Sequence, residues 1–221
     1  MVIKNIIFDF DGTLGDSKEC GIIATQKAFS AHQLTIPDAK TIEYYMGIPI
    51  EESFKLMSSR ILSEAEFNTL LSDFRQCYKQ YEDEYLKLFP GIKELLETLN
   101  QRSFQIFVVS SKHTEVLDRN LSILGIRDYF TETIGSNKVT QYKPDPEGID
   151  FIVNAHELNR QETLMVGDAI FDLQMGTSAQ VKTCAVSWGS HSEDNLKKEN
   201  PDFLIHFPEE LFNIIISQQN F

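Results

Sequence analysis

The stretch Ile6-Ile7-Phe8-Asp9-Phe10-Asp11-Gly12-Thr13 decides the fold of this chain. Its three leading apolar residues stand together without alternation, which is typical of a short strand buried on both faces of a sheet. Two aspartates and a glycine follow at once, so the strand ends in an acidic turn. In doubly wound α/β folds, ligands bind beyond the carboxyl ends of the strands. The stretch therefore predicts a buried strand that delivers carboxylates to a binding crevice.

Similar apolar runs recur along the chain and alternate with helical patterns. Strands are predicted over Phe104–Ser110, Thr163–Gly167 and Thr183–Ser187, with weaker candidates at Thr131–Ile134 and Phe203–Ile205. Amphipathic helical patterns lie between these runs, one opening at Pro90-Gly91, one over Val116 to Leu124 and one from about Asp145. Strands alternating with helices predict right-handed crossovers. We therefore expect an α/β fold, a Rossmann-like parallel sheet with helices on both faces.

The stretch from Ser17 to Glu82 breaks this rhythm, because its patterns are helical only. Ser63 with Glu66 fits a capping box that opens a long helix. Shorter helices are predicted over Glu19–His32 and Pro49–Ser59. We expect residues 17–82 to form an inserted α-helical cap domain. Residues 1–16 and 83–221 would then form the α/β core, joined to the cap by linkers near residues 12–16 and 83–89.

Composition excludes several classes of protein. The 221 residues are 42% hydrophobic, which excludes a wholly disordered chain. Lys and Arg number 20 against 33 Asp and Glu, a formal charge of −13. A chain this acidic is a poor binder of phosphate backbones, so no nucleic-acid partner is expected. A small anionic substrate would need a local positive charge.

Cysteine spacing and hydropathy bear on the compartment. The three cysteines, Cys20, Cys77 and Cys184, lie far apart without a Cys-x-x-Cys pair. This spacing argues against a disulfide framework or a zinc site and agrees with a reducing compartment. No apolar run approaches the length of a membrane span, and the N-terminus lacks a signal-type pattern. We expect a cytoplasmic protein without a membrane partner, a monomer or a weak homodimer.

Polar residues follow several of the predicted strands. Four separate elements deliver them to one crevice: Asp9 and Asp11, Ser110 and Ser111, Lys143, and Asp168 with Asp172. Two carboxylates about 4 Å apart repel by about 4 kcal/mol at an effective dielectric near 20. Mg²⁺ relieves such repulsion and suits carboxylates combined with a substrate phosphate. Lys143 supplies a second cation, so the crevice can bind an anion despite the acidic composition.

The same residue types suit phosphoryl chemistry. A carboxylate can attack phosphorus to form an aspartyl-phosphate. A second carboxylate can protonate the leaving oxygen and later activate water. The Ser110 hydroxyl and the backbone amides near Gly12 and Ser111 can hold phosphoryl oxygens.

These motifs together resemble those of a known family. Asp9-x-Asp11-Gly12-Thr13, the strand end at Ser110, Lys143-Pro144 and Gly167-Asp168-x-x-x-Asp172 resemble motifs I to IV of the haloacid dehalogenase superfamily. The motifs stand in the right order, and the resemblance covers essentially the whole chain. The helical insert resembles a C1-type cap, as in phosphoglycolate phosphatase-like members. Ala169 departs from the pattern, since relatives often carry Ser or Thr there.

The resemblance implies a role for each matching residue. Asp9 would be the nucleophile and a Mg²⁺ ligand. Asp11 would be the general acid and base, with its backbone carbonyl on the metal. Ser110 and Lys143 would bind the phosphoryl group. Asp168 would ligate Mg²⁺, and Asp172 would support it. The aspartate at position 11 separates phosphatases from dehalogenases in this family.

Four further residues are candidate substrate contacts. Gly12, Thr13 and Ser111 lie beside the catalytic residues in the sequence. Gly47 lies in a loop, Tyr45 to Glu51, that resembles the cap loop reaching into the site. This loop carries no Arg or Lys, which leaves phosphoglycolate itself open as the substrate.

Plainer interpretations compete for individual residues. Asp9 and Asp11 could be ordinary loop acids, and Lys143 a solvated lysine. Ser110 could only cap a helix. Asp172 could be a first-turn acid favoured by the helix dipole.

We predict a Mg²⁺-dependent phosphatase acting on a small phosphorylated metabolite. The alternatives are a pyrophosphatase, a β-phosphoglucomutase-like phosphoryl transferase and a non-catalytic phospho-ligand sensor on the same fold. A phosphonoacetaldehyde hydrolase-like enzyme would need a cap lysine, for which Lys18 and Lys55 are weak candidates.

Overall fold

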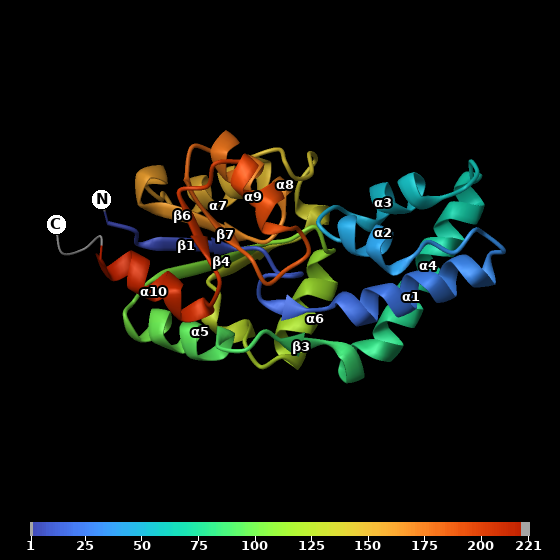
Figure 1. Ribbon diagram of the computed structural model, residues 1–221, viewed down its shortest axis with the longest axis horizontal. Coiled ribbons are helices and arrows are strands. Elements are labelled where there is room, and N and C mark those ends of the chain that lie inside the picture. The colour runs from blue at the N-terminus through green and yellow to red at the C-terminus, as the bar shows by residue number, and fades with distance from the viewer. Residues whose placement is uncertain (1, 218–221) are drawn as a thin grey trace.

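In the computed structural model, which describes residues 2–217, a parallel six-stranded sheet forms the centre of the larger lobe (Figure 1). Its strands are β1 (Asn5–Phe8), β4 (Gln105–Val109), β5 (Glu132–Ile134), β6 (Thr163–Gly167), β7 (Lys182–Val186) and β8 (Phe203–Ile205). Their order across the sheet is β5-β4-β1-β6-β7-β8. The predicted α/β fold is confirmed. The acidic turn therefore lies at the carboxyl end of a central strand, between the ends of β4 and β6.

Helices cover both faces of the sheet. The helices are α5 (Ile92–Gln101), α6 (Thr114–Ile123), α7 (Glu147–Ala155), α8 (Ile170–Ser178), α9 (Glu193–Lys198) and α10 (Pro208–Ser217). Ile6 and Phe8 of β1 pack in one apolar cluster with α5, α6 and α10. Ile7 packs in a second cluster with α7 and α8. Because both faces of β1 are buried, the strand is apolar at consecutive positions.

The smaller lobe is helical and consists of α1 (Lys18–Ala31), α2 (Ala39–Tyr44), α3 (Ile50–Met57) and α4 (Glu64–Tyr85) (Figure 1). We call these four helices, together with the loops that join them, the helical segment and the rest of the molecule the core. The segment has its own apolar cluster, in which Phe54 meets Phe29 and Phe74 edge to face, at 5.1 and 5.0 Å between ring centroids. The capping box of Ser63 and Glu66 is present at the start of α4.

Two short strands join the lobes. β2 (Gly15–Asp16) and β3 (Lys87–Leu88) pair in an antiparallel manner. The linker predicted over residues 83–89 is helical in its first part, because α4 continues to Tyr85. Glu82 explains this continuation. Its buried carboxylate accepts hydrogen bonds from Arg119 Nε at 2.5 Å and Asn120 Nδ2 at 2.8 Å, which attaches the end of α4 to α6.

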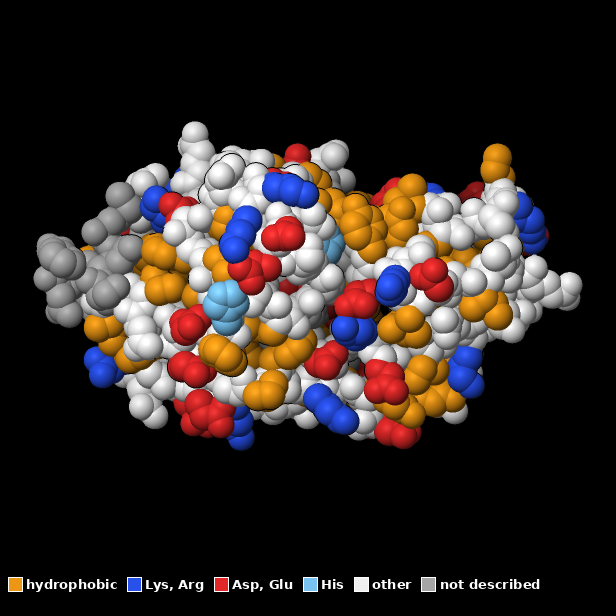
Figure 2. Space-filling view, viewed as in Figure 1, with side chains coloured by type: hydrophobic (Ala, Val, Ile, Leu, Met, Phe, Trp, Pro, Cys, Tyr) orange, Lys and Arg blue, Asp and Glu red, His pale blue; other side chains and the backbone are white. Residues whose placement is uncertain are grey.

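Three 3₁₀ helices complete the described elements, η1 (Arg127–Tyr129), η2 (Ser136–Lys138) and η3 (Arg160–Glu162). Acidic and basic side chains are interspersed over the face shown in Figure 2. Among residues 2–217, no helix has both the length and the apolar character needed to cross a membrane.

Candidate active site

The turn after β1 is built to meet the end of β6. The Asp9 amide donates to the Val166 carbonyl at 2.9 Å, which extends the pairing of the two strands by one residue. Gly12 has φ +86°, and a Cβ there would lie 2.3 Å from Oδ2 of Asp168. Only glycine combines this backbone conformation with this close approach. Position 12 thus lets the acidic turn close against Asp168.

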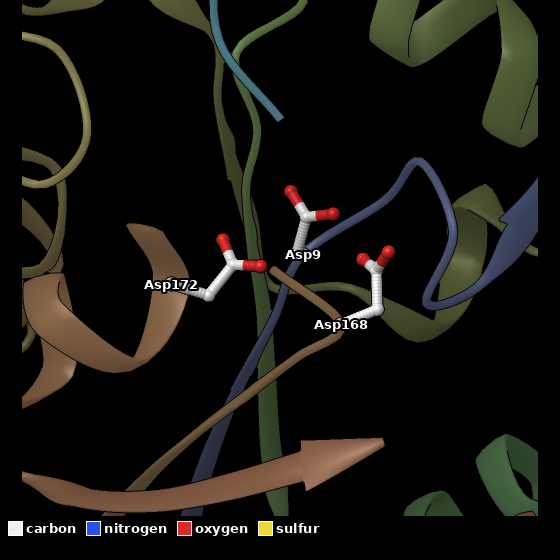
Figure 3. A group of neighbouring side chains, drawn as sticks. All are labelled: Asp9, Asp168 and Asp172. Carbon is white, nitrogen blue, oxygen red and sulfur yellow. The ribbon is translucent and has the colours of Figure 1, made fainter. Parts of the chain in front are cut away.

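Three carboxylates converge at this point (Figure 3). Asp9, Asp168 and Asp172 place carboxylate oxygens within 4.8 Å of one another, and all three residues are buried. Asp168 directly follows β6, and Asp172 lies in the first turn of α8. The Ala169 amide donates to Asp172 Oδ2 at 3.0 Å, which holds that carboxylate at the helix start. We call these three residues the acidic cluster.

Lys143 is the counter-charge of the acidic cluster. Its Nζ lies 2.5 Å from Asp9 Oδ1 and 2.7 Å from Asp172 Oδ1. Burial by itself would lower the pKa of the Lys143 ammonium, but the Asp172 and Asp9 carboxylates outweigh burial and raise it. Lys143 is therefore a charged residue of the site. Its 8% exposure contradicts a solvated loop lysine.

One ammonium does not balance three carboxylates. Burial raises the pKa of Asp9 well above its usual range, although Lys143 opposes this. Burial and the neighbouring Asp172 raise the pKa of Asp168 to about 7, against hydrogen bonds from Ser190 and Thr13. A further cation would relieve this excess charge. Because every donor in the acidic cluster is a carboxylate oxygen, the cluster suits a hard divalent cation such as Mg²⁺.

Asp11 has a different environment from Asp9. Its carboxylate Oδ1 accepts from Lys112 Nζ at 2.5 Å and also from the Ser17 hydroxyl. Lys112 lies over the rings of Phe10 and Tyr78, at 5.4 and 4.8 Å from their centroids. The Asp11 side chain is not among the three carboxylates of the acidic cluster. It is held apart, at the side of the site that faces the helical segment.

The two serines after β4 have separate contacts. Ser110 is buried, and its hydroxyl accepts from the Lys112 amide at 3.2 Å. The N-cap of α6 is His113, not Ser110. Ser111 donates its hydroxyl to the Gly47 carbonyl at 3.0 Å, across to the helical segment. Gly47 itself lies close to Ala169 and Phe171, since a Cβ on it would be 3.2 Å from each side chain.

Thr13 lies inside the molecule. It is fully buried, and its hydroxyl donates to Asp168 Oδ1 at 3.0 Å. Its carbonyl accepts from Trp188 Nε1 at 3.1 Å. In this structure Thr13 therefore positions Asp168, a role distinct from the expected substrate contact.

Two parts of the site were not predicted from the sequence. One is Lys112, the partner of Asp11. The other is the turn after β7, where the Ser190 amide donates to Asp168 Oδ2 at 2.7 Å and a Cβ on Gly189 would lie 2.2 Å from Asp168 Cβ. Both follow strand ends. The signal that could have identified them is the same as for the other site residues: a polar residue or glycine within a few positions of the carboxyl end of a parallel strand, here β4 and β7.

Comparisons with known proteins agree with this geometry. A family model described as haloacid dehalogenase-like hydrolase matches residues 6–186. Pyrophosphatase PpaX of Halalkalibacterium halodurans is 26% identical over 215 residues, which cover 97% of this chain and 98% of that protein.

Solved structures are also similar. A haloacid dehalogenase-like family hydrolase from Streptococcus pneumoniae has a TM-score of 0.84 and 29% identity, covering 96% of this chain and 98% of its own. A protein described as a predicted phosphoglycolate phosphatase from Haemophilus somnus has a TM-score of 0.87 and 23% identity, covering 96% and 97%. At that identity the second likeness supports the fold alone.

Proposed function

Because the chain belongs to the haloacid dehalogenase-like hydrolase family, we propose that it is a Mg²⁺-dependent phosphatase of a small phosphorylated metabolite. The observation that carries this proposal is the separation of two aspartates. Asp9 lies in the acidic cluster beside Lys143, whereas Asp11 lies outside it beside Lys112. The Asp9 carboxylate is thus available as nucleophile, and the Asp11 carboxyl group, which must be protonated when the substrate is bound, would be the proton donor.

In the first step, a carboxylate oxygen of Asp9 attacks phosphorus. The bond between phosphorus and the leaving oxygen breaks, and Asp11 gives its proton to that oxygen. Lys143 contacts Oδ1 of Asp9, which orients the carboxylate and leaves Oδ2 for the attack. The Ser110 hydroxyl and the Lys143 ammonium would bind phosphoryl oxygens, as the family resemblance implies.

In the second step, water attacks the phosphorus of the aspartyl-phosphate. Asp11, now a carboxylate, accepts a proton from that water. The bond between Asp9 and phosphorus breaks, which releases phosphate and restores the Asp9 carboxylate. The proton that Asp11 lost in the first step is thereby recovered, so the enzyme returns to its starting state.

Asp9, Asp168 and Asp172 would hold the metal ion, together with the backbone carbonyl of Asp11. Bound Mg²⁺ would neutralise charge on the carboxylates and on the phosphoryl group. We further propose that the helical segment acts as a cap, because Ser111 donates to the Gly47 carbonyl and Lys112 lies over the ring of Tyr78 in α4, which brings the segment and the core together beside Asp11.

The test is hydrolysis of p-nitrophenyl phosphate with Mg²⁺. Asp9→Asn removes the nucleophile and is expected to lower kcat by about 10³-fold or more. Asp118→Asn is a matched control, because Asp118 lies on α6 in an ion pair with Arg127, outside the site. Equal activity of Asp9→Asn and the wild type would refute the mechanism.

Pyrophosphate hydrolysis is a second candidate. The similarity to the pyrophosphatase PpaX along nearly the whole chain favours it. It would use the same residues, with phosphate in place of an alcohol as the leaving group.

A further inference from the structure

A cavity of about 440 Å³ lies between the helical segment and the core. Asp11, Ser111 and Lys112 line it on the core side. Since Asp11 is the proposed proton donor, the cavity is where the group that leaves phosphorus would lie. Its volume falls within the range of pockets that bind organic molecules, about 300–1,000 Å³.

The walls of the cavity are largely apolar. They are contributed by α2, the loop after it, α3 and α4. The aliphatic, methionine and phenylalanine residues of these elements that line the cavity are Ile42, Met46, Ile48, Ile50, Phe54, Met57 and Phe74. Such side chains form no hydrogen bonds with a charged group. Moving a charged group from water to this surface is unfavourable, whereas moving an apolar group there is favourable.

Three of the four lysines and arginines that line the cavity are paired with carboxylates. Among the cavity residues that the structure describes, Lys112 is paired with Asp11 at 2.5 Å, and Arg75 with Glu51 at 2.6 Å. Arg119 is paired with Glu82 at 2.5 Å. Lys79 also lines the cavity, but it lies on the exposed face of α4. A second phosphate group beside Asp11 would therefore have to compete with carboxylates for the three paired cations of the cavity.

We propose that the leaving group of the natural substrate has an apolar organic body, so that alkyl or aryl phosphates are better substrates than pyrophosphate. This proposal rests on the proposed phosphatase function. The phosphoryl group lies at Asp9 and Lys143, and the leaving oxygen at Asp11. The organic body extends from there against Met46, Ile48 and Phe54.

The experiment measures kcat/KM for ethyl, butyl and hexyl phosphate and for pyrophosphate, by release of phosphate. The three esters share an alkoxide leaving group and differ only in apolar length. We expect kcat/KM to rise about fourfold for each added methylene, chiefly through KM. We expect pyrophosphate to have a lower kcat/KM than hexyl phosphate.

Two variants test whether this cavity is responsible. Met46→Gln and Ile48→Thr place polar groups on its wall and should flatten the dependence on chain length. Ile61→Gln is the control, because Ile61 is 97% exposed and follows α3 in the same helical segment. It should keep the dependence of the wild type.

The outcomes separate the two proposals. A flat or falling dependence on chain length, or a preference for pyrophosphate, overturns the inference and leaves the phosphatase proposal standing. An unchanged dependence in both wall variants also overturns it. If neither these compounds nor p-nitrophenyl phosphate release phosphate, the proposed function itself fails.

Discussion

Two aspartates only two residues apart, Asp9 and Asp11, meet two different lysines. Lys143 contacts Asp9 from the loop before α7, and Lys112 contacts Asp11 from the turn after β4. Identical carboxyl groups acquire different roles when their surroundings differ. The proposed difference in role, with Asp9 as nucleophile and Asp11 as proton donor, would therefore depend on these two ammonium groups as well as on the aspartates.

Replacing Lys143 with methionine should destabilise the protein. Asp9 and Asp172 would remain buried without their ammonium partner, and removing one member of a buried ion pair costs about 3–5 kcal/mol. The measurement is the free energy of unfolding by urea at pH 7 with EDTA. Added Mg²⁺ should recover part of the loss.

Lys4→Met is the matched control for that variant. Lys4 pairs with Glu162 at the surface, where its side chain is 60% exposed, and such pairs contribute about 0–1 kcal/mol. Equal losses in the two variants would show that the buried position of Lys143 has no special weight.

At the scale of elements, the loop between α2 and α3 is docked on the core. Gly47 accepts from Ser111 and lies against Ala169, and the ring of Tyr44 stacks on His191 at 5.4 Å and an angle of 7°. Ala169 presents only a methyl group to this loop, which leaves room for the close approach. The end of α4 is attached to α6 through Glu82. Release of the loop would break fewer contacts than separation of α4 from α6, and it is the motion that we expect to open the site.

Gly47→Val should oppose docking of this loop. The added side chain would crowd Ala169 and Phe171, and overpacking of this kind costs about 1–3 kcal/mol. Because the cost falls on the docked state, kcat/KM for phosphate esters should fall by roughly 5- to 150-fold. The measurement is steady-state kinetics, with thermal unfolding to check the fold.

Gly21→Ala serves as the comparison for Gly47→Val. A Cβ at Gly21 would meet Met46 Cε at 3.4 Å, which is an ordinary contact. Alanine inside α1 should stabilise the fold by about 0.5–1 kcal/mol. A Gly47→Val protein that retained wild-type kinetics would argue against the docked loop as a functional state.

At the scale of the whole molecule, the acidic cluster exists only when the chain is folded. The turns after β1 and β6 and the first turn of α8 supply its members. A cation that binds this cluster and not the unfolded chain must raise the melting temperature. At a Mg²⁺ concentration 100 times its dissociation constant, the gain is about 2.7 kcal/mol, or about 5–10 °C for a chain of this size.

The measurement is thermal unfolding with Mg²⁺ and with EDTA. Asp168→Asn should lose most of the shift, because it removes a charged ligand from the cluster. Asp118→Asn should keep it, since Asp118 pairs with Arg127 on the surface of the core. A shift of the same size in both variants would place the cation elsewhere.

The strands could be predicted from the sequence because their pattern involves only residues that are neighbours along the chain. Every predicted strand is present, including the weaker two, and β6 has the predicted bounds. Consecutive apolar residues bounded by turn residues identify a buried strand without long-range information. The short helix α2 was missed. Its six residues include a single buried one, Ile42, so no apolar periodicity marks it.

The chain's own order of residues therefore determined the strands, the acidic turn after β1 and the residues that could carry chemistry, because these depend on neighbours along the chain. Tertiary structure alone decided which lysine each aspartate meets. Lys112 and Asp11 are 101 residues apart, and Lys143 and Asp9 are 134 apart. Such pairings arise from the order of strands in the sheet and the docking of the helical segment, and no local pattern encodes them.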